Sequence, residues 1–166
     1  MFETLWSEFS APFRATPVEV AALRLAAAMV LGGIMGFERE MHDKPAGLRT
    51  HMMIALAACL FTLASFELME VAAAREDDNV RLDPLRLTEA ITAGVAFLAA
   101  GTIITGGDKV RGLTTGAGMW FAGAVGLSCG IGNLTLAGLA TGIGLVVLWL
   151  LRRVTRALGP DRPADD

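Results

Sequence analysis

The residues of this chain best suited to chemistry are acidic side chains gathered in one short stretch. Glu38, Glu40 and Asp43 lie close together, and Asp108 occurs in a similar stretch further along. Carboxylates together with retained waters are the usual ligands of Mg²⁺. Arg39 and nearby bases can instead pair with these acids on the surface of a turn, where such pairs are common. Two interpretations therefore stand side by side, a divalent-cation site and a solvated charged turn.

Other chemistry finds less support in the sequence. His42 and His51 are the two histidines; neither belongs to a recognisable catalytic motif, and there is no glycine-rich phosphate loop. Glu38 and His42 are one helical turn apart, but two ligands are too few for a structural zinc site. The net charge of −3, without a basic patch, gives no reason to expect a nucleic-acid partner. We therefore expect a protein that is not an enzyme and needs no cofactor, with Mg²⁺ as the one ion to consider.

The acidic stretch leads into an eight-residue segment that the chain contains twice. The first copy is Asp43-Lys44-Pro45-Ala46-Gly47-Leu48-Arg49-Thr50, and the second, 65 residues later, is Asp108-Lys109-Val110-Arg111-Gly112-Leu113-Thr114-Thr115. A match at a fixed offset indicates a repeated structural unit, here two helices joined by a charged turn. The candidate cation-binding or functional residues of the two turns are Glu38, Arg39, Glu40, Asp43, Arg49, Thr50, Asp108, Thr114 and Thr115.

Apolar segments surround these turns. Hydrophobic residues make up 54% of the 166, and the mean hydropathy of +0.54 exceeds that of ordinary soluble domains. The fold class that we expect is an all-α integral membrane protein with five transmembrane helices. The expected spans cover residues 18–36, 48–72, 88–106, 113–131 and 134–151, between an interfacial segment at 1–17 and a cytoplasmic tail at 152–166.

The order of the spans predicts the architecture. The first four spans would form two helical hairpins of like orientation, a parallel repeat about an axis along the membrane normal, with the fifth helix packed beside them. The two turns and the tail carry nine Lys and Arg residues, against four on the opposite side. The positive-inside rule therefore predicts a cytoplasmic C-terminus and an N-terminus outside.

Glycines recur at spacings that suit close helix contact. Small residues four apart allow two helix backbones to approach each other in a membrane. Three such pairs occur in the expected spans, and they serve either packing within the chain or a homodimer interface. The glycines that we assign to helix packing are Gly32, Gly36, Gly94, Gly101, Gly126, Gly130, Gly138 and Gly142.

Two charges within the expected spans are also related by the repeat. Arg24 and Glu89 are 65 residues apart, the offset that aligns the turns. A charge inside a membrane costs about 2.5–3.5 kcal/mol on insertion scales. The two can form an intramembrane ion pair across the repeat axis, or each can extend separately to the outer interface, which is the commoner fate of charges near helix ends.

Several motifs in this order resemble the MgtC/SapB family of bacterial inner-membrane proteins. They are Gly36-Phe37-Glu38-Arg39-Glu40, Ala46-Gly47-Leu48-Arg49-Thr50, Gly94 with Phe97-Leu98 and Ala100-Gly101, and Gly112-Leu113-Thr114-Thr115. The resemblance covers about residues 20–150. Ala96 and Ala99 replace the glycines usual in the third helix, and Gly116 and Gly118 interrupt a stretch that is usually rich in alanine.

The resemblance implies a role in magnesium homeostasis and adaptation to low magnesium in the inner membrane. It favours a regulator that contacts other membrane proteins, such as the ATP synthase or a cation transporter; the alternative is a transporter or channel for magnesium or another cation. Longer family members carry a cytoplasmic C-terminal domain. Because this sequence ends soon after Arg156, we do not expect a function that needs that domain.

Overall fold

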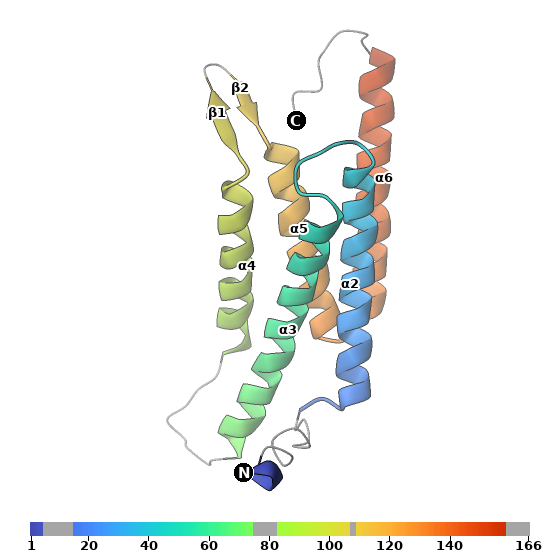
Figure 1. Ribbon diagram of the computed structural model, residues 1–166. Coiled ribbons are helices and arrows are strands. Elements are labelled where there is room, and N and C mark those ends of the chain that lie inside the picture. The colour runs from blue at the N-terminus through green and yellow to red at the C-terminus, as the bar shows by residue number, and fades with distance from the viewer. Residues whose placement is uncertain (5–14, 75–82, 107–108, 159–166) are drawn as a thin grey trace.

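A computed structural model shows five long helices and one short β-hairpin (Figure 1). It describes residues 1–4, 15–74, 83–106 and 109–158. The helices are α2 (Val18–Glu40), α3 (Leu48–Ala73), α4 (Pro84–Ala100), α5 (Leu113–Gly130) and α6 (Leu134–Leu158). The strands β1 (Ile104–Gly106) and β2 (Lys109–Arg111) pair antiparallel, with Ile104 opposite Arg111. The chain is therefore mostly helical, and most of the predicted interfacial segment at 1–17 lies outside the described residues.

Local signals explain where the helices begin. Asp83 accepts a hydrogen bond from the backbone N–H of Leu85 at 2.9 Å, and Pro84 occupies the first helical position of α4. Asn133 caps α6 in the same way, through the N–H of Leu136 at 3.1 Å. Gly47 and Gly112 directly precede α3 and α5, so the repeated Gly-Leu pair marks a helix start in both copies.

The third predicted span differs from the structure at both ends. It was expected over residues 88–106, whereas α4 covers Pro84–Ala100 and residues 104–106 form β1. Asp83-Pro84 starts the helix because proline is well accommodated in a first helical turn. After Gly101, residues 104–106 pair antiparallel with residues 109–111. The β-branched residues Ile104 and Val110 in these segments favour strands over a continued helix. The second charged turn is therefore a β-hairpin, unlike the first.

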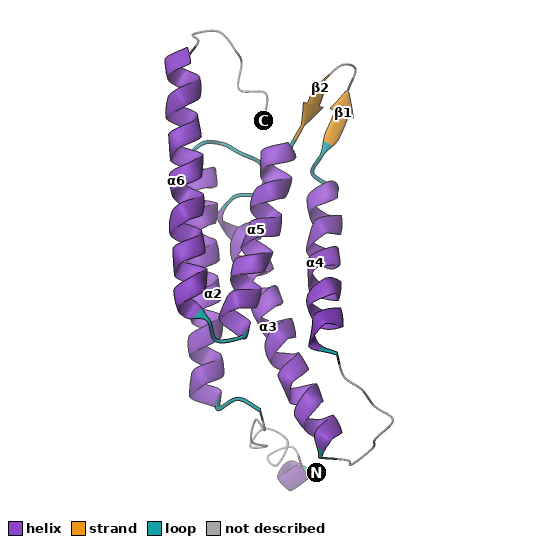
Figure 2. Ribbon diagram, turned by 180° about the vertical axis from the view of Figure 1, so that it is seen from behind, coloured by secondary structure: helices purple, strands orange, loops and turns teal. Residues whose placement is uncertain are grey.

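The helices form a bundle with α3 and α5 at its centre. α2 packs against α3 and α5, α4 lies against α5 at one edge, and α6 covers α5 and α2 at the other (Figure 2). The turn after α2, the β-hairpin and the C-terminal end of α6 all lie at the same end of the bundle (Figure 1). The core consists largely of small residues, among them Ala28, Ala55, Cys59, Ala122 and Val125, which allows close backbone approach.

The outer faces of the helices are apolar. Exposed side chains include Phe61 on α3, Phe97 on α4 and Leu139, Ile143 and Val146 on α6. Within the described residues, three helices are long and apolar enough to cross a membrane: α2, α3 and the part of α6 from Leu134 to Val154. α4 has 17 residues, and α5 contains five glycines among its 18. The structure thus gives three candidate spans by length and composition.

Candidate functional site in the polar layer beneath the first turn

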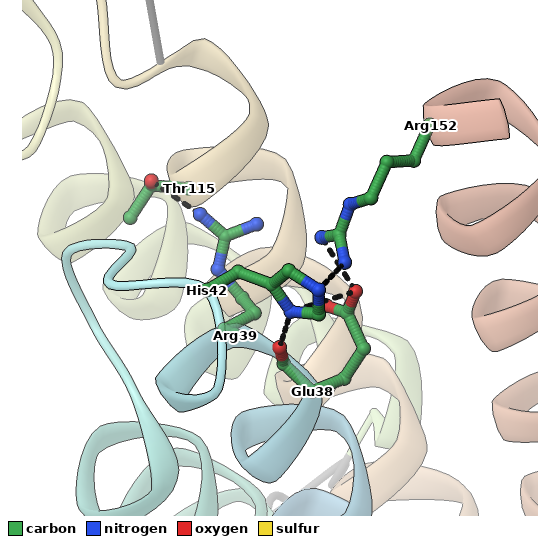
Figure 3. A network of polar contacts seen from close by, with 5 residues as sticks. All are labelled: Glu38, Arg39, His42, Thr115 and Arg152. Atoms are coloured by element: carbon green, nitrogen blue, oxygen red, sulfur yellow. Dashed lines mark hydrogen bonds and ion pairs between the residues drawn. The ribbon is translucent and has the colours of Figure 1, made fainter. Parts of the chain in front are cut away.

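Arg39, in the last turn of α2, points into the interior of the bundle. Its side chain is 3% exposed, and its Nη2 donates to Oγ1 of Thr115, which is fully buried on α5, at 2.6 Å (Figure 3). A hydrogen bond from a charged group contributes about 1.5–3 kcal/mol. The interpretation of Arg39 as a base on the surface of a solvated turn is therefore wrong. Arg39 and Thr115 join α2 to α5 inside the protein.

His51 lies beside this contact, in the first turn of α3, and is fully buried. Its Nδ1 is 3.1 Å from the carbonyl oxygen of Gly47. A carbonyl only accepts, so Nδ1 carries a proton, and in the neutral imidazole Nε2 is then an acceptor. This Nε2 is buried and has no hydrogen-bond partner among the described residues. His51 thus adds a polar group to the interior.

Gly118 on α5 makes room for His51. A Cβ at position 118 would lie 3.2 Å from Nε2 of His51 and 3.7 Å from Cδ of Arg39. The family that the sequence resembles usually has an alanine-rich stretch here. The close approach of His51 explains why glycine suits position 118 of this chain. Sequence reasoning noted His51 and Gly118 separately and missed their contact, because nothing in the spacing brings α3 and α5 together.

A second polar cluster joins α2 to α6. Nη2 of Arg152 lies 2.7 Å from Oε1 of Glu38, and Nη1 of Arg152 contacts Nε2 of His42 (Figure 3). Nδ1 of His42 is 2.7 Å from the carbonyl oxygen of Glu38. Sequence reasoning placed Arg152 in a cytoplasmic tail, whereas it belongs to α6 and is bound to α2. We refer to Glu38, His42 and Arg152 as the α2–α6 cluster.

Glu40 has a structural role in the first turn. Its Oε2 accepts a hydrogen bond from the backbone N–H of Leu48 at 2.9 Å, which caps α3. A Cβ at Gly47 would collide with this carboxylate, so a larger residue there would displace the Glu40 side chain from its hydrogen bond. Asp43 has a positive φ of 52° and is exposed. The first turn therefore uses one of its acids, Glu40, to start the next helix.

The other predicted turn residues are not gathered around a common point. Arg49 is exposed, Thr50 and Thr114 are half-buried, and Asp108 lies outside the described residues. Among the residues that the structure describes, no group of three or more His, Cys, Asp or Glu side chains is arranged to hold a metal ion. Of the predicted turn residues that the structure describes, Arg39 and Thr115 contact each other, and Glu38 contributes to the α2–α6 cluster.

The predicted ion pair between Arg24 and Glu89 is wrong. Nη1 of Arg24 donates to the carbonyl oxygen of Gly130 at 2.9 Å, at the C-terminal end of α5. Glu89 is exposed on α4, at the edge of the bundle away from α2. A cation at a helix C-terminus is favourable because it satisfies the last carbonyls and the helix dipole. Arg24 therefore caps α5.

Seven of the eight glycines that were assigned to helix packing fall into two groups. A Cβ on Gly32, Gly36, Gly126 or Gly130 would meet α3 at 3 Å or less, at Ala55 or Thr62 among other residues. These four glycines therefore pack α2 and α5 against α3. In contrast, a Cβ on Gly94, Gly138 or Gly142 would have no atom within 4 Å. Gly101 ends α4.

Apolar outer faces, glycine-mediated helix contacts and a few buried polar contacts define a helical membrane protein. The chain belongs to the MgtC family, whose family model matches residues 25–157. This confirms the family indicated by the motifs.

Several curated relatives share this body. The chain is 37% identical to the protein MgtC of Brucella abortus strain 2308, over 86% of the chain and 56% of the relative. It is 38% identical to the protein SapB of Bacillus subtilis, over 84% of the chain and 60% of the relative. It is 35% identical to YhiD of Escherichia coli K12, named as a candidate magnesium transporter, over 80% of the chain and 61% of the relative. The chain thus spans a little over half the length of these relatives. No solved structure gives a significant match.

Proposed function

We propose that this protein is an inner-membrane regulator linked to magnesium homeostasis, which acts through helix contacts with other membrane proteins. Its family and the magnesium-related name of one relative support the link to magnesium. Its partners on this proposal are another membrane protein, such as the ATP synthase or a cation transporter, or a second copy of the chain. All five helices cross the membrane, with α2–α3 and α4–α5 as two parallel hairpins and the C-terminus in the cytoplasm.

One observation carries the regulator proposal. Three glycine pairs are spaced for helix contact. The pairs Gly32–Gly36 and Gly126–Gly130 pack against α3, whereas a Cβ on Gly138 or Gly142 of α6 would have no atom within 4 Å. Glycine adds little favourable contact with lipid, whereas it allows a second helix to approach closely. The outer face of α6 is therefore the part of the bundle best suited to bind another transmembrane helix.

Growth at low magnesium tests this proposal. In a strain that depends on this chain for such growth, Gly138→Leu with Gly142→Leu is expected to abolish support while the protein stays in the membrane. Gly94→Leu is the matched control, since Gly94 is equally open but lies on α4. Full growth with the α6 double variant would contradict the proposal.

The second candidate function is transport of magnesium or another cation, which the name of YhiD favours. Uptake by purified protein in liposomes separates the two. A regulator gives no magnesium uptake above that of empty vesicles. Saturable uptake that disappears in Glu38→Gln or Asp43→Asn would establish transport instead.

A further inference from the structure

The C-terminal half of α6 is weakly packed. Within its most apolar stretch 11% of residues are buried, against 33% in α2 and 39% in α3. Among the α6 side chains that the structure describes, the buried ones are Ala137 and Thr141, near the start of the helix. From Gly142 to Val154 every residue is half-buried or exposed. Along this stretch, the polar contacts of Arg152 with Glu38 and His42 hold α6 to α2.

The contact between Arg152 and His42 requires one protonation state. The carbonyl oxygen of Glu38 can only accept, so Nδ1 of His42 donates to it. In neutral imidazole the other nitrogen, Nε2, is then an acceptor, and it receives the N–H of Arg152. In imidazolium both nitrogens carry protons. Two N–H groups and two positive charges would then face each other.

Several charged groups surround His42. Glu38 is the acid of the cluster: its Oε1 lies 2.7 Å from Nη2 of Arg152 and 3.8 Å from Nδ1 of His42, so a charged His42 and Arg152 would share one carboxylate. On α2, Arg39 points to Thr115 and Glu40 to the start of α3. On α6, the guanidinium of Arg153 stacks on Trp149 at 4.5 Å.

In the turn, Asp43 and Lys44 follow His42 directly, and Arg49 is exposed at the start of α3. These groups add charges of both signs around His42. Because these charges have both signs, the contacts of His42 that matter for the attachment of α6 are those with Glu38 and Arg152.

We propose that the α2–α6 cluster is a pH-sensitive attachment: neutral His42 holds the end of α6 against α2, and protonation of His42 releases it. Histidine is the side chain that commonly changes charge between about pH 5 and 8. Release detaches the end of α6 while its start stays in the bundle, where Ala137 and Thr141 are buried. The attachment does not depend on whether the protein regulates or transports.

Distance measurements between spin labels test the attachment. The full chain, with Cys59→Ala and Cys129→Ala, carries labels at Phe37→Cys on α2 and Val154→Cys on α6, both exposed positions, in lipid nanodiscs. At about pH 8 a single short distance is expected, and at about pH 5 that population is lost to longer, broader distances. An unchanged distribution at the two pH values would overturn the proposal.

Two variants identify the group responsible. His42→Gln removes the titrating group and is expected to give the same distribution at both pH values. Arg153→Gln is the matched control, because Arg153 is next to Arg152 but stacks on Trp149, and it is expected to keep the pH response. A response that persists in His42→Gln would assign the effect to another group, such as Glu38, and would overturn the proposal.

Discussion

Arg39 and Thr115 meet inside the bundle at 2.6 Å, although one ends α2 and the other begins α5. The pair brings a guanidinium that is 3% exposed into a core of small apolar residues. Such a group is tolerated only when it is hydrogen-bonded. The two polar residues therefore fix how α2 and α5 sit against each other.

Thr115→Val is expected to destabilise the protein by about 1.5–3 kcal/mol, because it leaves the buried guanidinium without this acceptor. Unfolding in detergent, followed by circular dichroism, measures the loss. Thr114→Val is the matched control, since the adjacent Thr114 is only half-buried. Equal stability of the two variants would show that the contact contributes nothing.

Gly126→Ala is expected to lower the amount of folded protein sharply. The added Cβ would collide with the backbone of Ala55 on α3, and overpacking in a tight contact costs about 1–3 kcal/mol or more. Gly138→Ala makes the same chemical change at an open site and is expected to be tolerated. The monodisperse fraction after purification measures both. A tolerated Gly126→Ala would contradict the packing of α5 on α3.

Arg24→Met is expected to destabilise the protein by about 1–3 kcal/mol, because the last carbonyls of α5 lose a charged donor. Glu89→Gln is expected to change little, since Glu89 is exposed. Exchanging the two charges, Arg24→Glu with Glu89→Arg, is expected to be no better than Arg24→Glu alone. Recovery in the double variant, measured by thermal unfolding, would revive the ion pair.

Impermeant thiol labelling of intact cells tests the orientation. In a cysteine-free background, Asp83→Cys at the start of α4 is expected to react from outside, and Met41→Cys in the first turn is expected to react only after the membrane is opened. Both positions are exposed, and they lie at opposite ends of the bundle. Reaction of Met41→Cys in intact cells would contradict a cytoplasmic turn.

The sequence by itself determined the family, the helical class and the starts of four helices. Val18, Leu48, Leu113 and Leu134 begin helices where they were predicted. These boundaries are local: a proline, a glycine or an asparagine directly precedes each apolar run. The start of α4 was missed by four residues, although Asp83 as a cap and Pro84 in the first turn are local signals of a helix start.

Only the tertiary structure decided which polar residues are buried and what they contact. Arg39 and Glu38 are adjacent in the sequence, yet one side chain enters the core toward Thr115 and the other pairs with Arg152 on α6 (Figure 3). The repeat offset suggested that Arg24 faces Glu89, but α3 and α5 occupy the centre and Arg24 reaches Gly130 instead. The periodicity of one helix shows which residues share a face. The neighbour of that face depends on how distant helices pack, and this is set by close contacts such as Gly126 against Ala55.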